Sequence, residues 1–280
     1  MPADPSRTHT GSSARLLHSA RRSRGRGGSA CWHGAGVIDA WLDLIHGAMC
    51  VGCLRPGRSL CAACIATLPS RGRVVRPTPC PAGLVTCFAT GEYDGLLRAI
   101  VLAHKERGTF SLADPLGGLL AAAAARALDP SAPTVLVPVP SRPVVVRSRG
   151  HDPMLRITRA AARRLRVTGH RVRVAQVLRQ RGEVDDQAGL SARQRAANLT
   201  GSMTVRAGAR AALARADTPL SLLVCDDVLT TGATAREAQR ALEVSGLPVR
   251  AVVTVAATRK RVPLGGLART TARLGPTAFR

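Results

Sequence analysis

The stretch Leu222-Leu-Val-Cys-Asp-Asp-Val-Leu-Thr-Thr-Gly-Ala-Thr234 decides the fold of this chain. Its apolar first half is typical of a buried strand, and its last residues begin a helix, so Asp226 and Asp227 stand near a strand end. The turn that follows is made of small and hydroxyl-bearing residues. Such a turn lets backbone N–H groups approach a phosphate at a helix N-terminus. It comprises Thr230, Thr231, Gly232, Ala233 and Thr234.

The two acids of this stretch suit a neutral sugar better than a phosphate, because carboxylates accept hydrogen bonds from hydroxyl groups. Together, acids and turn therefore predict a site for a ribose 5-phosphate. A P-loop is excluded, since the chain has no G-x-x-x-x-G-K-[ST] motif. The remaining alternative is an ordinary turn between a strand and a helix, which would require neither the paired acids nor the Thr-Thr-Gly-Ala-Thr run.

Strand and helix patterns alternate outward from this stretch, which predicts an α/β fold with a mostly parallel sheet and flanking helices. Aromatic residues make up only 2% of the chain, so the core must consist of Leu, Val, Ile and Ala. The expected strands are 84–89, 134–139, 172–178, 220–225 and 249–256. The expected helices are 93–105, 112–128, 155–165, 191–199 and 234–244.

Four cysteines in two C-x-x-C pairs precede this domain: Cys50, Cys53, Cys61 and Cys64. Two such pairs are typical of a structural Zn²⁺ site with four thiolate ligands and no open position for catalysis. Free or redox-active thiols and an iron–sulfur cluster are the alternatives. Cys80 and Cys87 lie outside the spacing, and Cys87 is expected to be a buried apolar residue in a strand.

The stretch from Leu222 to Thr234 resembles the 5-phosphoribosyl-1-pyrophosphate (PRPP) binding motif of type I phosphoribosyltransferases. A cysteine module followed by such a domain also resembles the ComF family of competence proteins. The resemblance spans residues 37–258 and includes 102–108, 137–142, 149–150 and 187–190, together with Arg193, Arg195 and Asn198. It implies a type I phosphoribosyltransferase-like fold that binds or transfers phosphoribosyl groups, with Mg²⁺ accompanying PRPP. It identifies no acceptor.

The resemblance also implies roles for individual residues. Asp226 and Asp227 would hold the ribose hydroxyls and favour positive charge on the sugar, and Thr230 to Thr234 would wrap the 5-phosphate. Ser141 and Arg142 would face pyrophosphate. The residues from Arg179 to Asn198 would form a loop that closes over the substrate.

Other groups near the implied site have less defined roles. Lys105 and Arg149 are candidates for offsetting the charge of the leaving pyrophosphate. His104 and His151 are candidates for acid–base catalysis, although a histidine beside charged neighbours is more often only solvated.

The chain departs from the family pattern at two places. His151, Asp152 and Pro153 replace an aromatic residue, Asn and Gln after Arg149-Gly150, and Val184 replaces a Thr before Gln187. We expect these changes to leave ligand binding intact and to affect catalysis. Cys225 in place of Val should matter little.

Composition sets the remaining boundaries. Residues 1–36 are expected to be a disordered extension, with a transit peptide as the alternative. We expect residues 37–68, which begin with a helix at 37–48, to form the zinc-binding module, and residues 69–83 to be a linker. The phosphoribosyltransferase-like domain is expected at residues 84–259 and a flexible tail at residues 260–280. C-x-x-C spacing indicates a reducing, cytoplasmic setting. No apolar run is long enough to predict membrane insertion.

The net charge of +24 usually indicates a polyanionic partner. Here 39 of the 41 basic residues are arginine, a bias also expected of a GC-rich genome. Three functions remain: a PRPP-dependent transferase, a non-catalytic competence protein acting in DNA uptake, and a nucleotide-sensing regulator. Single-stranded DNA and a competence helicase are the candidate partners of the second.

Overall fold

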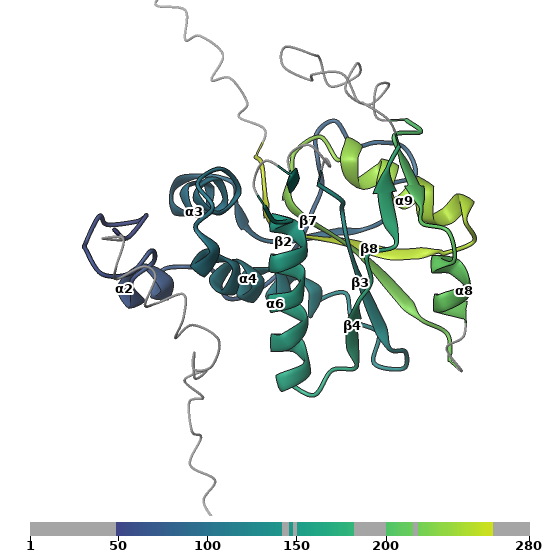
Figure 1. Cartoon of the computed structure of the whole chain (residues 1–280), viewed down its shortest axis with the longest axis horizontal. Coiled ribbons are helices and arrows are strands. Elements are labelled where there is room, and N and C mark those ends of the chain that lie inside the picture. Colours follow the sequence, from purple (N-terminus) through teal and green to yellow (C-terminus); the bar gives the residue numbers. More distant parts are fainter. Residues whose placement is uncertain (1–48, 142–145, 148–149, 182–199, 215–217, 260–280) are drawn as a thin grey trace, which may run out of the picture. The chain divides into compact units, whose positions relative to one another are not determined.

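The computed structural model of the chain describes residues 49–141, 146–147, 150–181, 200–214 and 218–259 (Figure 1). Within this part of the chain, no helix is both apolar enough and long enough to cross a bilayer. Several expectations lie outside the described residues: the extension 1–36, the helix 37–48, Arg142, Arg149, Val184, most of the loop 179–198 with its helix 191–199, and the tail 260–280.

A six-stranded sheet has the order β1-β2-β8-β7-β3-β4. Its parallel strands are β2 (Cys87–Glu92), β8 (Val249–Ala257), β7 (Ser221–Leu229), β3 (Thr134–Pro138) and β4 (Val172–Val174). The edge strand β1 (Arg73–Val75) pairs antiparallel with β2, and β5 (Leu178–Gln180) forms a separate antiparallel pair with β6 (Met203–Val205). The expected α/β fold with a mostly parallel sheet is confirmed.

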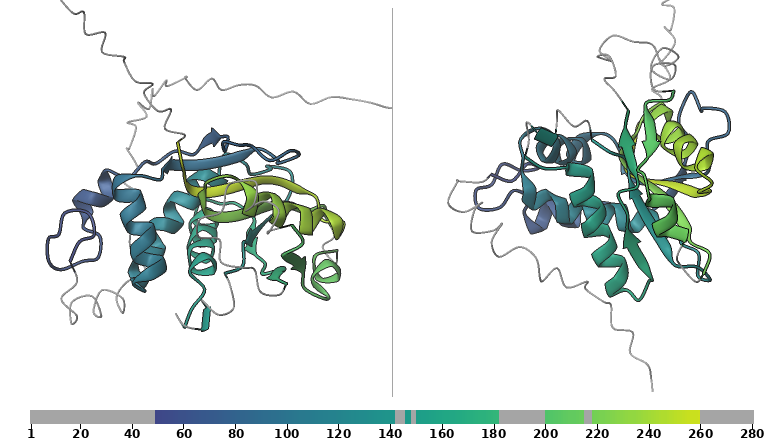
Figure 2. Two further views of the ribbon diagram at one scale, coloured as in Figure 1. Left: turned by 90° about the horizontal axis from the view of Figure 1, so that it is seen from above. Right: turned by 45° about the vertical axis from the view of Figure 1, so that its right-hand side comes forward.

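Helices cover both faces of this sheet (Figures 1 and 2). One face carries α3 (Gly95–Glu106), the 3-10 helix η1 (Phe110–Leu112), α4 (Ala113–Ala124) and α6 (Pro153–Val167). The other face carries α8 (Ala209–Ala214) and α9 (Ala233–Val244). Side chains alternate between the two faces along β7, as the period of a strand requires. Leu223 and Cys225 lie in the apolar cluster on the α6 face, and Leu222 and Val224 lie in the apolar cluster on the α9 face.

Two short segments differ from the expectation. Residues 69–83, expected only to link the two domains, contain β1, whose Val74 is 64% exposed. A strand of three residues, between Gly72 and Arg76-Pro77, is too short to leave a periodic signal, so only its pairing with β2 makes it a strand. The expected strand 172–178 divides, because β4 leaves β3 after the bond from the Ala175 N–H to the Leu136 carbonyl, and β5 then pairs with β6.

The connections between the parallel strands change direction at one point of the sheet. From β3 the chain passes through α6 to β4, and from β7 it passes through α9 in the opposite direction to β8. Because β3 and β7 are parallel neighbours, their carboxyl ends flank a topological switch point. Ligands of open α/β sheets bind in the crevice at such a point. Asp226 and Asp227 lie at this end of β7.

The cysteine module consists of a turn closed by the bridge between Met49 and Pro56, followed by α2 (Ala62–Ala66). Cys50 and Leu60 are buried in the same apolar cluster as Leu97 and Ile100 of α3. The module therefore packs on the α/β domain through α3.

Candidate functional site: the acid pair and the turn after β7

The acid pair sits where β7 emerges beyond β3, since Cys225 is the last residue of β7 opposite a residue of β3. Asp227 is buried, with 5% of its surface exposed, and Asp226 is half-buried beside Thr254 of β8. The Lys105 ammonium, at the end of α3, forms an ion pair with Asp227. The Asp227 N–H donates to the Asp226 carboxylate at 2.9 Å. The site thus carries two acids and one cation from distant segments.

Burial and the neighbouring charge shift the protonation of these groups. Burial first, and then the Asp227 carboxylate, raise the pKa of Asp226 to about 7, against the opposing effect of Lys105. Burial alone would lower the pKa of Lys105, but the carboxylates of Asp227 and Asp226 outweigh it and raise that pKa. Near neutral pH, Asp226 can therefore donate as well as accept a hydrogen bond, while Lys105 stays charged.

The turn after the acids is closed by Gly232, the residue before α9. Gly232 has a φ of +72°, and a Cβ there would lie 2.9 Å from Pro77 Cγ and 3.0 Å from Leu84 Cδ2. Only glycine combines this conformation with so close an approach. The Arg236 N–H donates to the Gly232 carbonyl at 2.8 Å, which starts the α9 hydrogen-bond ladder.

Most backbone N–H groups of this turn have no hydrogen-bond partner among the described residues. The Ala233 N–H donates to the Thr231 hydroxyl at 3.5 Å. The N–H groups of Thr230, Thr231, Gly232, Thr234 and Ala235 make no hydrogen bond to any described residue. A helix start with unoccupied N–H groups and a favourable dipole can bind an anion such as a phosphate. The turn and the acid pair are thus adjacent, as the sequence predicts.

Sequence reasoning missed the segment that covers this turn, because residues 69–83 read as a linker. Gln239 of α9 holds it: its side chain donates to the Gly83 carbonyl at 2.9 Å and accepts from the Val85 N–H at 3.0 Å. Arg236 adds a bond to the Ala82 carbonyl at 3.0 Å. Only the proline run in this segment hints at a fixed backbone, and nothing in the sequence connects it to Gly232.

The loop after β3 is less open than the resemblance implies. The Ser141 hydroxyl donates to Asp152 at 3.0 Å, and the same carboxylate oxygen caps α6 by accepting from the Leu155 N–H at 3.1 Å. The side chain expected to face pyrophosphate is therefore engaged by an anion. Asp152 is one of the departures from the family pattern, so its capping role explains its presence.

The two candidate histidines lie among packed side chains. His104 is fully buried, with Nδ1 3.2 Å from the Thr109 carbonyl oxygen and Nε2 3.4 Å from that of Pro153. Burial lowers the pKa of His104. The His151 ring packs edge-on against Phe110, with 4.5 Å between centroids. The contacts of both rings thus indicate structural roles.

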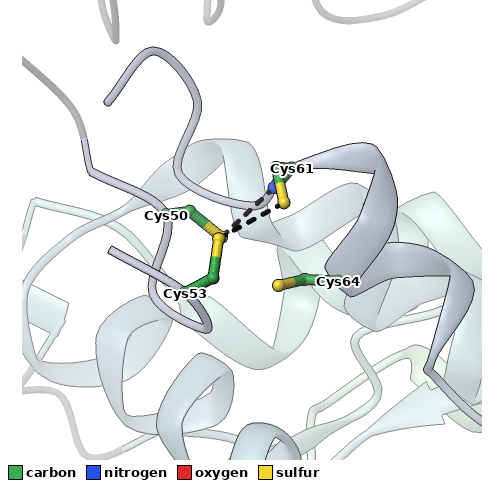
Figure 3. Close-up of side chains that lie close together, drawn as sticks. All are labelled: Cys50, Cys53, Cys61 and Cys64. Atoms are coloured by element: carbon green, nitrogen blue, oxygen red, sulfur yellow. Dashed lines mark hydrogen bonds between the residues drawn. The ribbon is translucent and has the colours of Figure 1, made fainter. Parts of the chain in front are cut away.

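The four cysteines converge at the start of the described chain (Figure 3). Their sulfur atoms all lie within 4.8 Å of one another, and the Sγ atoms of Cys53 and Cys61 are 3.6 Å apart. Sulfurs around a tetrahedral zinc ion are separated by about 3.8 Å, given Zn–S bonds of about 2.3 Å. The cluster is therefore close enough to hold a metal ion, and its geometry is compatible with zinc.

Hydrogen bonds around Cys50 prepare it as a ligand. The Cys61 N–H donates to the Cys50 sulfur at 3.4 Å. Burial raises the pKa of Cys50, but the backbone N–H groups of Cys61, Cys53 and Gly52 outweigh burial and lower it to about 6. Metal binding requires the thiolate form, which this environment favours. Cys87, by contrast, is buried in β2, as expected, and burial raises its pKa to about 12.

Two comparisons with known proteins found no match. No protein-family model matches the chain, and no curated protein matches its sequence. The functional interpretation therefore depends on the geometry of the site.

Proposed function

We propose that this chain binds PRPP or a related ribose 5-phosphate at the turn after β7 and transfers the phosphoribosyl group to an acceptor. One observation carries the proposal: apart from that of Ala233, the turn's backbone N–H groups make no hydrogen bond within the described residues, and they adjoin two acids at the switch point of the sheet. A phosphate suits the N–H groups, and neutral sugar hydroxyls suit the acids.

In this proposal each group has a distinct task. The N–H groups and hydroxyls of the 230–234 turn bind the 5-phosphate, and Asp226 and Asp227 accept hydrogen bonds from the ribose hydroxyls. The same carboxylates favour the positive charge that develops on the sugar as pyrophosphate leaves. Mg²⁺ would enter with PRPP and offset the charge of the pyrophosphate. Lys105 keeps the acid pair compensated while the site is empty.

We further propose that the cysteine cluster holds structural zinc and that the protein works in the cytoplasm. Four thiolates close the coordination sphere, so the metal would stabilise the module and take no part in the reaction. A reducing compartment keeps such thiols free to bind metal.

Calorimetry with PRPP and Mg²⁺ tests the proposed site. The intact chain should bind PRPP, and Asp227→Asn should bind it at least about tenfold more weakly, since a charge-assisted hydrogen bond contributes about 1.5–3 kcal/mol. Asp129→Asn is the matched control. Asp129 also forms an ion pair, with Arg250, but near the amino ends of the parallel strands. Equal binding by both variants and the wild type would remove the site assignment.

A second candidate, a non-catalytic ComF-type protein in DNA uptake, has an observation of its own in α6. The exposed residues of this helix include Arg156, Arg159, Arg163 and Arg166, and no carboxylate in the described residues pairs with them. On α9, Arg236 and Arg240 each pair with a glutamate. Codon bias would act on both helices alike, so the uncompensated α6 face favours a polyanion such as single-stranded DNA.

Salt-dependent binding of single-stranded DNA tests this candidate. Changing Arg159, Arg163 and Arg166 to Gln should reduce the slope of log K against log salt by about 2, given about 0.7 per phosphate contact. The control changes Arg55, Arg58 and Arg71, which are exposed in and beside the cysteine module, and removes equal charge. Equal slopes in the two triple variants would leave only non-specific attraction to a basic protein, with or without a competence helicase as partner.

A further inference from the structure

Helix α3 connects the cysteine module with the acid pair. Leu96 lies in its first turn and Lys105 in its last, nine positions further along the helix, so about 13.5 Å separates them along the axis. A helix of this length transmits a shift at one end to the other, because its backbone ladder resists bending. Contacts that fix the position of Leu96 therefore also influence the position of Lys105.

At the first turn, α3 is in close contact with the cysteine cluster. A Cβ placed on Gly52 would lie 2.8 Å from Leu96 Cδ1 and 2.8 Å from Cys64 Sγ. Gly52 stands between two of the cysteines, so the turn that brings the sulfurs together also fits against Leu96 with no space for a methyl group. Cys50 and Leu60 extend this contact into the cluster around Leu97.

At its last turn, α3 reaches the acid pair through Lys105, which pairs with Asp227. The helix packs chiefly against η1 and α4, whereas α4 itself lies on β2 and β8. Apart from Leu97, which packs against Gly91 of β2, the sheet supports α3 mainly through other helices, and the module adds packing at the far end.

We propose that the cysteine module positions Lys105 through α3, so that metal in the module controls ligand affinity at the acid pair. With the sulfurs gathered, Gly52 and Leu96 fix the helix, and Lys105 compensates Asp227. With the metal removed, nothing holds the four sulfurs together, the turn around Gly52 opens and α3 loses its outer support. The effect on affinity rests on the proposed function; the effect on Lys105 does not.

Amine labelling of the full-length protein measures this coupling directly. The chain has only two lysines, Lys105 and Lys260, so mass spectrometry resolves both, and Lys260 serves as the internal reference. Removing the metal with a chelator should increase the labelling rate of Lys105 relative to Lys260 by about threefold or more, as expected for local opening. An unchanged ratio in protein shown to be metal-free and still folded by circular dichroism would overturn the proposal.

A variant that keeps all four cysteines separates positioning from unfolding. Leu96→Ala removes the contact with the module and should speed Lys105 labelling while metal remains bound. Leu128→Ala is the control, because Leu128 is also half-buried against the same cluster but lies outside α3. Equal labelling in the two variants would refute the route through α3, even if chelation has an effect.

Calorimetry then connects the coupling to ligand binding. PRPP should bind the Leu96→Ala variant about threefold or more weakly than the Leu128→Ala variant, a difference of about 0.7 kcal/mol or more. If even the wild type fails to bind PRPP, the proposed function falls while the labelling result still decides the coupling. If PRPP binds both variants equally, control of affinity by the module is refuted.

Discussion

The cysteine cluster and the acid pair both gather side chains that can carry negative charge, yet they differ in the cation that lies beside them. In the module, four sulfurs lie within 4.8 Å of one another, and within the described residues no Lys or Arg side chain bonds to them. At the acid pair, Lys105 from α3 supplies a cation. The first cluster is close enough to hold a metal ion, which we propose compensates it, whereas the second already has its cation.

On the proposed function, this difference separates a site that supports the fold from a site prepared for a ligand. A buried charge without a partner is costly, so proteins pair it or bind an ion. The acid pair is only partly relieved by its lysine, since the pKa of Asp226 is still raised. Such incomplete compensation is typical of functional sites.

Removing one sulfur ligand should have the largest effect. Cys64→Ser is expected to abolish stoichiometric metal binding and to expose residues 49–68 to protease. The loss should be about 3 kcal/mol, which is roughly 6–12 °C in melting temperature for a chain of this size. Ala63→Ser, at an exposed neighbouring position of α2, adds the same hydroxyl without removing a ligand and should melt like the wild type. A metal content unchanged in Cys64→Ser would argue against the four-sulfur site.

Parts of both sites follow from the sequence because their signals are local. The C-x-x-C pairs and the run from Asp226 to Thr234 lie within single segments, so spacing alone predicts a metal cluster and a turn between a strand and a helix. Strands β7 and β8 and helices α6 and α9 are long and strongly patterned, and each of their ends lies within four residues of the expected one.

The rest depends on contacts between distant segments. Nothing near Lys105 indicates that it would pair with Asp227 rather than point toward pyrophosphate. Strand β1 exists only because β2 offers an edge, and the packing of Pro77 on Gly232 requires the whole α9 face. The Ser141–Asp152 bond joins a loop to a helix cap, so a departure from the family pattern becomes intelligible only in three dimensions.

The pH dependence of stability should distinguish the acid pair from an ordinary ion pair. With its pKa raised to about 7, Asp226 holds a proton in the folded state that the unfolded chain releases near pH 4. Stability therefore falls as pH rises between about 4 and 7. Asp226→Asn removes this penalty and still accepts from the Asp227 N–H. It should be more stable than the wild type by about 1–2 kcal/mol at pH 8, with the difference vanishing near pH 4.

In the same denaturation experiment, Asp129→Asn should change the stability at high pH in the opposite direction. Hydrogen bonds from the Ser131 hydroxyl and N–H lower the pKa of Asp129, with a smaller contribution from Arg250. Its stabilising contribution is therefore present above pH 4 and lost as the pH falls through the lowered pKa. The variant should be less stable than the wild type at pH 8. Parallel pH profiles for the two variants would show that Asp226 is an ordinary surface acid.

The smallest expected effect lies at Leu54 in the turn of the cysteine module. Leu54 has a φ of +59° and is 66% exposed, and its N–H donates to the Cys50 carbonyl at 2.8 Å. A left-handed conformation costs a residue with a Cβ about 1–2 kcal/mol, and glycine avoids that cost. Leu54→Gly should therefore raise the unfolding free energy of the metal-loaded protein by about 0.5–1 kcal/mol, after the greater backbone entropy of glycine in the unfolded chain is subtracted.

Leu54→Ala controls for the loss of the exposed side chain, because alanine keeps the Cβ and hence the strain. It should unfold at the same denaturant concentration as the wild type, and Leu54→Gly should unfold at a higher one. If both variants behave alike, the turn is not strained at Leu54. If Leu54→Gly is more stable with metal but not after chelation, gathering the four sulfurs is what forces Leu54 into this conformation. The strain would then belong to the metal-bound module, and no corresponding cost would be expected at the acid pair, whose turn already has glycine at position 232.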